Sequence, residues 1–182
     1  MIVDEIQTGL GRTGRMWASD HSGVSPDVMT VAKGLAGGVP IGATITRREI
    51  MDCLKKGEQT NTFGGNPLAC AAGLATLDYI VKHDLPTMAQ QKGETYVSGL
   101  RRIVQDHKLG REVRGMGLML ALELRVDIQN ILMESIKKGV IFTYSGRNVI
   151  RLLPPLIIGD DLIRRSLNVL ETVISAEEKK YG

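Results

Sequence analysis

The chain has 182 residues, of which 43% are hydrophobic, 24% charged and 4% aromatic, as in a soluble globular protein with one domain or a domain and a smaller second one. Its formal charge of +3 is scattered, which excludes the basic footprint of a nucleic-acid-binding protein. No apolar run approaches the roughly 20 residues that cross a membrane, and residues 1–8 lack the features of a signal peptide. We therefore expect a cytoplasmic protein with reduced cysteines, Cys53 and Cys70.

Residues 1–3 predict a buried strand that ends at Asp4. Chain termini usually lie at the surface of a domain, so a start within a core strand is unusual. We therefore expect that the chain begins partway through a larger fold.

Residues 9–14, GLGRTG, match the pattern G-x-G-x-x-G of dinucleotide-binding proteins. That use of the pattern requires a helix that opens within the glycines and an acidic residue after the next strand. Residues 15–23 are too few for a crossover helix, and the next strand ends on Lys33. Dinucleotide binding therefore stays the weaker alternative, and we expect Trp17 and His21 to be packing residues.

Residues 26–38 form an apolar, β-branched run that ends on Lys33 and continues into glycines, which predicts a strand and then a turn with unusual dihedral angles. A lysine at the end of a buried strand is costly unless its amine has a task or a partner. Lys33 could extend its amine to solvent, which is what this segment alone favours. Alternatively, a desolvated Lys33 amine could be a nucleophile that forms a Schiff base.

The rest of the first half predicts a strand at 41–46, a short helix at 48–55, a polar loop at 59–65 and a helix that starts at Asn66 and Pro67 and runs to about His83. Small residues in this helix would let it approach another element closely. Residues 1–85 therefore predict part of an α/β layer with mostly parallel strands.

The character of the chain changes at 84–86. The following segments predict helices at 87–108, 126–138 and 160–176, and strands at 112–124, 140–142 and 149–152. Gly139 should close the second of these helices, and the last should bury Leu162, Ile163, Leu167, Leu170, Val173 and Ile174. Residues 86–182 therefore predict a smaller α+β unit, and there are no internal repeats.

Asp4 and Lys33 both follow predicted strands, and ligands of open parallel sheets bind at the carboxyl ends of the strands. A carboxylate and an amine in such a crevice fit pyridoxal phosphate, because the amine can hold its aldehyde and the carboxylate can keep its pyridine nitrogen protonated. The alternative for Asp4 is a carboxylate that caps nearby backbone amides.

The motifs that carry this chemistry resemble those of the class III aminotransferases, pyridoxal-phosphate enzymes of the aspartate-aminotransferase-like fold. The similar segments are residues 4–14, 32–34, 62–67, 113–118 and 149–156. They agree in order and spacing and cover nearly all of the chain. The resemblance implies that 1–85 are the C-terminal portion of the cofactor-binding large domain and that 86–182 are the C-terminal small domain.

The resemblance assigns a role to each of five residues. Lys33 matches the lysine that forms the Schiff base (an aldimine) and shuttles a proton, and Asp4 matches the carboxylate on the pyridine nitrogen. Gln7 matches the residue that hydrogen-bonds the ring hydroxyl oxygen. Thr62 matches a threonine that reaches the phosphate of the neighbouring subunit, which implies a homodimer. Arg151 matches the arginine that clamps the substrate carboxylate, as a guanidinium fork can, whereas without the family it would be a surface ion-pair residue.

The implied activity is ping-pong transfer of an amino group from an ω-amino acid to a 2-oxo acid such as 2-oxoglutarate, with no metal, nucleic acid or membrane involved. Residues 33–43 and 150–155 are most similar to the acetylornithine branch, and the 4-aminobutyrate, ornithine and lysine-biosynthesis branches stay open. The amino-terminal half of the family, with its phosphate cup and stacking aromatic, has no counterpart here. A truncated, non-catalytic fragment is therefore the alternative.

Overall fold

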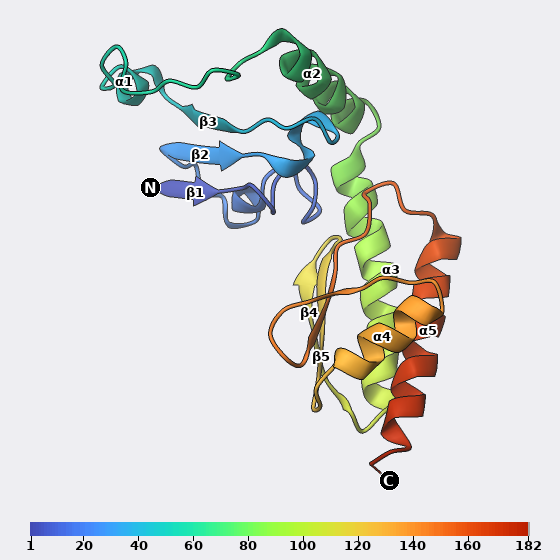
Figure 1. Ribbon diagram of the computed structural model, residues 1–182. Helices are drawn as coiled ribbons and strands as arrows, with labels where there is room; N and C mark the ends of the chain where they lie inside the picture. Colours follow the sequence, from blue (N-terminus) through green and yellow to red (C-terminus); the bar gives the residue numbers. More distant parts are fainter. Residues whose placement is uncertain (182) are drawn as a thin grey trace. The chain divides into compact units, whose positions relative to one another are not determined.

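A computed structural model describes residues 1–181, which form two compact units (Figure 1). Unit 1 is Met1–Thr87, and unit 2 begins at Met88. The units divide inside the long helix α3 (Leu85–Asp106), and each is described here by itself. Within residues 1–181, no helix is both long enough and apolar enough to cross a bilayer.

Unit 1 contains a three-stranded sheet of β1 (Ile2–Asp4), β2 (Val28–Val31) and β3 (Ala43–Thr46), in that order. The expected parallel arrangement holds for β1 and β2, but β3 is antiparallel to β2. A parallel return needs a crossover of about a dozen residues or more, usually with a helix. The β2–β3 connection instead holds the short 3-10 helix η2 (Lys33–Ala36) and two left-handed glycines, which reverse the chain.

The prediction that the first strand is buried is wrong for the described chain. Ile2 is 73% exposed, whereas Val31 in the central strand is 2% exposed. β1 has β2 as its one strand neighbour in this sheet, so an edge of β1 stays open. The sequence identified an apolar strand correctly, but an apolar composition alone does not determine what covers a strand.

Three further helices complete unit 1, namely η1 (Ala18–Ser22), α1 (Arg48–Met51) and α2 (Pro67–Lys82). The predicted start of α2 is confirmed, since Asn66 Oδ1 accepts a hydrogen bond of 2.9 Å from the backbone N–H of Ala69. α1 is shorter than the predicted helix at 48–55. α2 packs on η2, and its buried Gly73 lies on that side.

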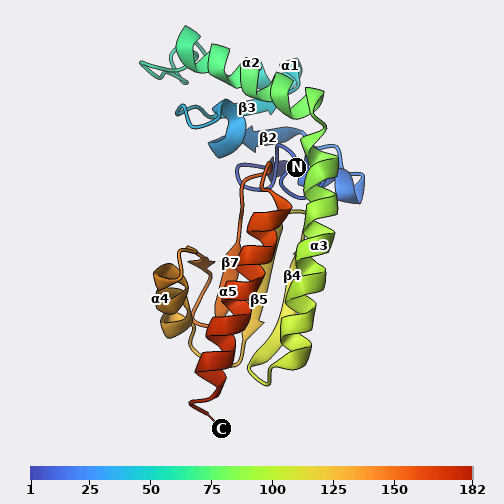
Figure 2. The same cartoon turned by 90° about the vertical axis from the view of Figure 1, so that its right-hand side faces the viewer.

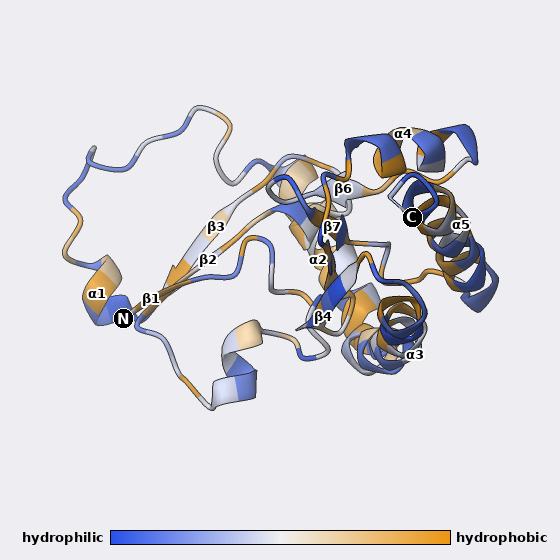
Figure 3. Cartoon of the chain, turned by 90° about the horizontal axis from the view of Figure 1, so that it is seen from below, coloured by the Kyte–Doolittle hydropathy of each residue, from blue (hydrophilic) through white to orange (hydrophobic). Residues whose placement is uncertain are grey.

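Unit 2 contains an antiparallel sheet of β4 (Gly110–Met116), β5 (Met119–Leu124), β7 (Val149–Leu152) and β6 (Thr143–Tyr144), in that order. Its helices are α3, α4 (Gln129–Lys137) and α5 (Asp160–Glu178). In Figure 2, α3 and α5 run side by side. Figure 3 shows that both helices have a hydrophilic and a hydrophobic side, as the periodicity of their sequences predicts.

Two strand predictions in unit 2 need correction. The single strand expected at 112–124 is a hairpin of β4 and β5, because the chain turns at Gly117, whose φ of 52° is left-handed. The strand expected at 140–142 is not formed, and β6 begins at Thr143 instead. Gly139, with φ of 78°, closes α4 as predicted.

The core of unit 2 lies between its sheet and its helices. Leu122, Ile150 and Ile163 are fully buried there, as are Leu100 and Leu170. The prediction for α5 is therefore largely confirmed, but Leu162 is 50% exposed. Successive residues of a helix point about 100° apart, so the side chain before a core residue faces away from the core.

Candidate functional site

Asp4 ends β1, and its partner in the parallel pairing with β2 is Thr30. The backbone N–H of Glu5 continues the pairing by donating a 2.9 Å hydrogen bond to the carbonyl oxygen of Thr30. Lys33 follows in the chain two residues after the end of β2 at Val31. Adjacent strands lie about 4.8 Å apart, so the structure brings Asp4 and Lys33 to the same edge of the sheet.

Lys33 does not end a buried strand, which corrects the premise drawn from the sequence. It is the first residue of η2 and is exposed. Its φ of 47° is left-handed, an unfavourable conformation for a non-glycine residue that often marks a functional site. Within residues 1–181 its ammonium makes no ion pair or side-chain hydrogen bond, so no other group of the described chain holds it.

The Asp4 carboxylate caps one nearby backbone amide, as the alternative to a cofactor role predicted. Its Oδ1 accepts a 2.9 Å hydrogen bond from the backbone N–H of Ile6. The second oxygen has no hydrogen-bond partner in the part of the chain that the structure describes, and Asp4 is exposed. One oxygen therefore fixes the carboxylate on the loop and the other can take a ligand.

Glu5 organises the loop that carries Gln7, a feature that sequence reasoning missed. It is 1% exposed, and its carboxylate accepts hydrogen bonds from the Thr8 hydroxyl and, at 2.9 Å, from the backbone N–H of Ser19. Burial opposes ionisation, but the bonds from Thr8 and from backbone amides outweigh it and lower the pKa of Glu5. A carboxylate directly after a strand, with a threonine three residues on, was the available signal.

The glycine-rich segment 9–14 does not open a helix, so the structure does not support the dinucleotide alternative. Leu10 and Gly11 have φ of 59° and 90°, and the segment forms turns. A Cβ at Gly9 would lie 2.9 Å from the Trp17 ring, and His21 Nε2 lies 3.1 Å from the Thr13 hydroxyl. Trp17 and His21 thus pack and bond within this loop.

Thr62 and Arg151 lie on other elements. Thr62 is exposed in the loop that precedes α2, in unit 1, and no hydrogen bond joins it to Asp4, Gln7 or Lys33 in the described chain. Arg151 is half-buried in β7, in unit 2, where its Nε donates to the Thr143 hydroxyl at 3.4 Å. Asp4 and Lys33 therefore follow neighbouring strands of unit 1, and Arg151 lies in unit 2.

The residues at the edge of the sheet fit one end of a pyridoxal phosphate. A free amine and a carboxylate with an open oxygen are the two groups that its aldehyde and its pyridine nitrogen require. No group of three or more His, Cys, Asp and Glu side chains within residues 1–181 could hold a metal ion.

The fold is similar to that of solved α/β aminotransferases. The ornithine aminotransferase from Toxoplasma gondii ME49 is 38% identical with a TM-score of 0.93, and the match covers 98% of this chain and 44% of that one. The acetylornithine aminotransferase from Elizabethkingia anophelis is 34% identical with a TM-score of 0.90, over 96% and 45% of the two chains.

The model of the family described as Aminotransferase class-III matches residues 1–174, so this chain belongs to the class III aminotransferases. The acetylornithine aminotransferase of Caldanaerobacter subterraneus is 43% identical over 96% of this chain and 44% of its own length. That of Methanocaldococcus jannaschii is 40% identical over 98% and 45%. The chain thus spans less than half the length of these relatives.

Proposed function

We propose that this chain takes part in the transfer of an amino group from an ω-amino acid resembling acetylornithine to a 2-oxo acid such as 2-oxoglutarate, with pyridoxal 5'-phosphate as the cofactor. The observation that carries the proposal is the parallel pairing of β1 and β2, because Asp4 ends β1 and Lys33 follows the end of β2 by two residues. Family membership supports it. When bound, the cofactor supplies an electron-withdrawing ring to the substrate.

In this proposal Lys33 holds the cofactor covalently through its amine and then moves the proton at the reacting carbon of the substrate. The open oxygen of Asp4 holds the proton on the pyridine nitrogen. Gln7 donates its amide N–H to the ring oxygen, and Glu5 keeps the loop of Gln7 in place through Thr8 and Ser19.

Thr62 and Arg151 complete the proposed set. We assign to Thr62 the phosphate of the cofactor in a second subunit, which requires a homodimer, and to Arg151 the substrate carboxylate. The hydrogen bond from Arg151 Nε to Thr143 leaves its terminal nitrogens for a two-pronged contact. We further propose that 1–85 belong to the cofactor-binding large domain, that 86–182 form the small domain and that the protein is cytoplasmic.

Relatives named acetylornithine aminotransferase support the acetylated amino donor. The similar structures named ornithine aminotransferase favour ornithine as the second candidate. These candidates are separated by the initial rates of glutamate formation from 2-oxoglutarate with acetylornithine, ornithine or 4-aminobutyrate as the amino donor. The account expects acetylornithine to give the highest kcat/KM.

The main alternative is a fragment without activity of its own, which the coverage of 44% of the relatives' length favours. The decisive experiment measures glutamate formation by this chain alone and by this chain co-expressed with the remaining part of the Caldanaerobacter relative. Activity that depends on Lys33 in either arm supports the transferase. Glutamate formation that is unchanged in Lys33→Ala, or absent in both arms with bound cofactor, contradicts it.

A further inference from the structure

The glycine-rich segment 9–14 is largely buried, and it has no part in the chemistry proposed for Asp4 and Lys33. Leu10, within this segment, is 5% exposed and has a left-handed φ of 59°. This conformation is unfavourable for a leucine, and it persists only where the surrounding structure holds it. A buried side chain on such a backbone therefore points to a contact that the local fold requires.

The contact of Leu10 is with the turn that begins at Lys33. A Cβ added to Gly34 would lie 3.7 Å from Leu10 Cδ1, which is an ordinary van der Waals distance. The helix α2 meets the same turn three residues later, where a Cβ added to Gly37 would lie 3.1 Å from Thr76 Oγ1. The turn of Lys33 is thus bounded by the glycine-rich segment at Gly34 and by α2 at Gly37.

Glu5 holds the loop that contains this segment, which we define as residues 5–19. Its Oε1 accepts a 2.9 Å hydrogen bond from the backbone N–H of Ser19, 14 residues further along the chain. Its Oε2 accepts a hydrogen bond from the Thr8 hydroxyl. One buried carboxylate therefore joins the two ends of the loop 5–19, and the loop follows directly after Asp4.

We propose that the loop 5–19 is a positioning element that couples Asp4 to Lys33, with Glu5 and Leu10 as its positioning residues. Glu5 positions Asp4, its neighbour in the chain, and Leu10 positions Lys33 through the turn that it contacts. This role rests on the proposed function and gives the glycine-rich segment a task other than dinucleotide binding. Its particular consequence is that a change at Leu10 should loosen the turn of Lys33 as well as the loop.

Hydrogen exchange of the full 182-residue chain, without cofactor, tests this coupling. The amides of Leu35 and Gly37 report on the turn, because each donates a backbone hydrogen bond within it. Leu10→Ala should lower the protection of both amides about tenfold, since it removes the apolar contact that holds the turn. The matched control is Leu68→Ala at an exposed position of α2, which should leave their protection unchanged.

Covalent capture of pyridoxal phosphate by Lys33, trapped with borohydride and mapped by mass, gives a second readout that a loss of stability alone would not change. Leu10→Ala and Glu5→Gln should each slow the labelling of Lys33 about tenfold and leave that of Lys82 unchanged, at a temperature where circular dichroism shows both variants folded. Leu10→Met restores an apolar side chain of similar volume and should recover the rate. Glu49→Gln, at an exposed site of α1, is the control for lost charge.

Unchanged protection of Leu35 and Gly37 in Leu10→Ala would overturn the coupling, whether or not the cofactor binds. Labelling of Lys33 that falls in neither variant, or that falls equally in Glu49→Gln, would overturn the positioning role. No label at Lys33 in the wild type would contradict the proposed function and with it the positioning role. The exchange of the two amides would in that case still decide whether the loop and the turn are coupled.

Discussion

The two units differ in how completely they cover their own sheets. In unit 2, the inner positions Leu120, Leu122 and Ile150 are 2% exposed or less. In unit 1, Ile2 and Ile45 remain 73% and 49% exposed. The helix α2 shows the same contrast, because it buries small residues on η2 and leaves Leu68 and Leu74 in solvent. Unit 2 thus has a core of its own, whereas much of the apolar surface of unit 1 has no cover within the described chain.

This difference has a functional counterpart. The proposed cofactor residues Asp4, Gln7 and Lys33 lie in the unit with the open apolar surface, and exposed patches of this kind mark sites of association. Arg151, the proposed substrate-binding arginine, lies in the unit with the complete core. We infer that unit 2 provides a stable support for Arg151, and that the positions of the proposed cofactor residues depend more on what else associates with unit 1.

The largest expected effect comes from truncation of the core of unit 2. Leu122→Ala should lower the free energy of unfolding of unit 2 by about 3 to 4 kcal/mol, through lost burial and a residual cavity. The matched truncation in unit 1, Leu74→Ala at a site 64% exposed, should change stability by less than about 0.5 kcal/mol. Hydrogen exchange of β5 and α2 amides measures both. Similar losses at the two sites would contradict the comparison.

Two helical glycines sharpen the comparison further. A Cβ at Gly93 in α3 would lie 2.1 Å from the carbonyl oxygen of Gly117 in the β4–β5 turn, whereas at Gly73 in α2 the nearest atom, Leu35 O, is 3.7 Å away. Gly93→Ala should therefore destabilise unit 2 by about 2 to 3 kcal/mol. Gly73→Ala should stabilise α2 by up to about 1 kcal/mol.

Urea unfolding followed by circular dichroism reports both glycine variants, and the fluorescence of the single tryptophan, Trp17, reports unit 1 alone. The account expects opposite signs for Gly93→Ala and Gly73→Ala. The same sign for both would show that helix propensity, rather than backbone contact, determines the outcome.

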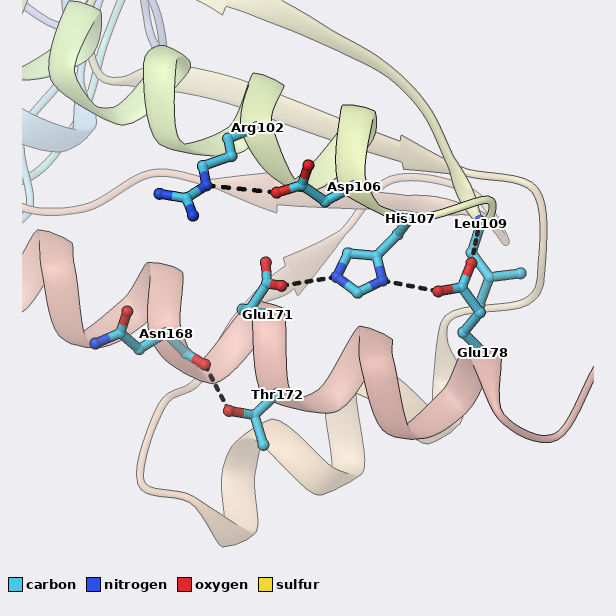
Figure 4. A network of polar contacts seen from close by, with 8 residues as sticks. All are labelled: Arg102, Asp106, His107, Leu109, Asn168, Glu171, Thr172 and Glu178. Atoms are coloured by element: carbon cyan, nitrogen blue, oxygen red, sulfur yellow. Dashed lines mark hydrogen bonds and ion pairs between the residues drawn. The ribbon is translucent and has the colours of Figure 1, made fainter. Parts of the chain in front are cut away.

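A smaller, pH-dependent effect is expected at His107, which links the end of α3 to α5 (Figure 4). Its Nδ1 lies 2.8 Å from Glu178 Oε2 and its Nε2 lies 2.9 Å from Glu171 Oε1. Burial opposes protonation of the imidazole, but the hydrogen bonds and charges of Glu178 and Glu171 outweigh it and raise the pKa of His107. The bond to His107 in turn lowers the pKa of Glu178.

The pKa of His107 is raised in the folded protein. Its contribution to the free energy of unfolding is therefore complete below the unfolded pKa of about 6.5, and it is lost as the pH rises through the folded pKa. The contribution of Glu178 to the free energy of unfolding is present above its unfolded pKa of about 4.3. It is lost as the pH falls through the lowered pKa of the folded state. His107→Gln should therefore destabilise unit 2 by about 1 to 2 kcal/mol near pH 6 and by less at pH 9.

Thermal unfolding of wild type and His107→Gln from pH 5 to pH 9 measures this dependence. The control is His83→Gln in unit 1, an exposed residue that makes no ion pair in the described chain. A loss for His107→Gln that does not change with pH would mean that the side chain contributes packing rather than charge.

The sequence was most informative where a short motif determines local geometry. The start of α2 was predicted from the side chain of Asn66 and the proline after it, and the end of α4 from Gly139. Long-range features were less accessible. The direction of β3 depends on how the chain reverses after Lys33, and the hairpin of β4 and β5 depends on one glycine, Gly117, inside one alternating apolar run.

The candidate site shows the same division between local features, which the sequence predicts, and long-range features, which it does not. The positions of Asp4 and Lys33 after neighbouring strands followed from the two predicted strand ends. The exposure of Lys33, its left-handed backbone and the buried Glu5 did not, because they depend on contacts between segments distant in the sequence.

The central claim is that Lys33 and Asp4 act on one cofactor, and peptide mapping after borohydride reduction tests it most directly. The chain is mixed with one equivalent of pyridoxal phosphate, reduced, digested and analysed by mass. We predict that the label is confined to Lys33, is lost in Lys33→Ala, is reduced in Asp4→Asn and is unchanged in Lys82→Ala. Label spread over Lys33, Lys55 and Lys82, with the same total in Lys33→Ala, would contradict the account.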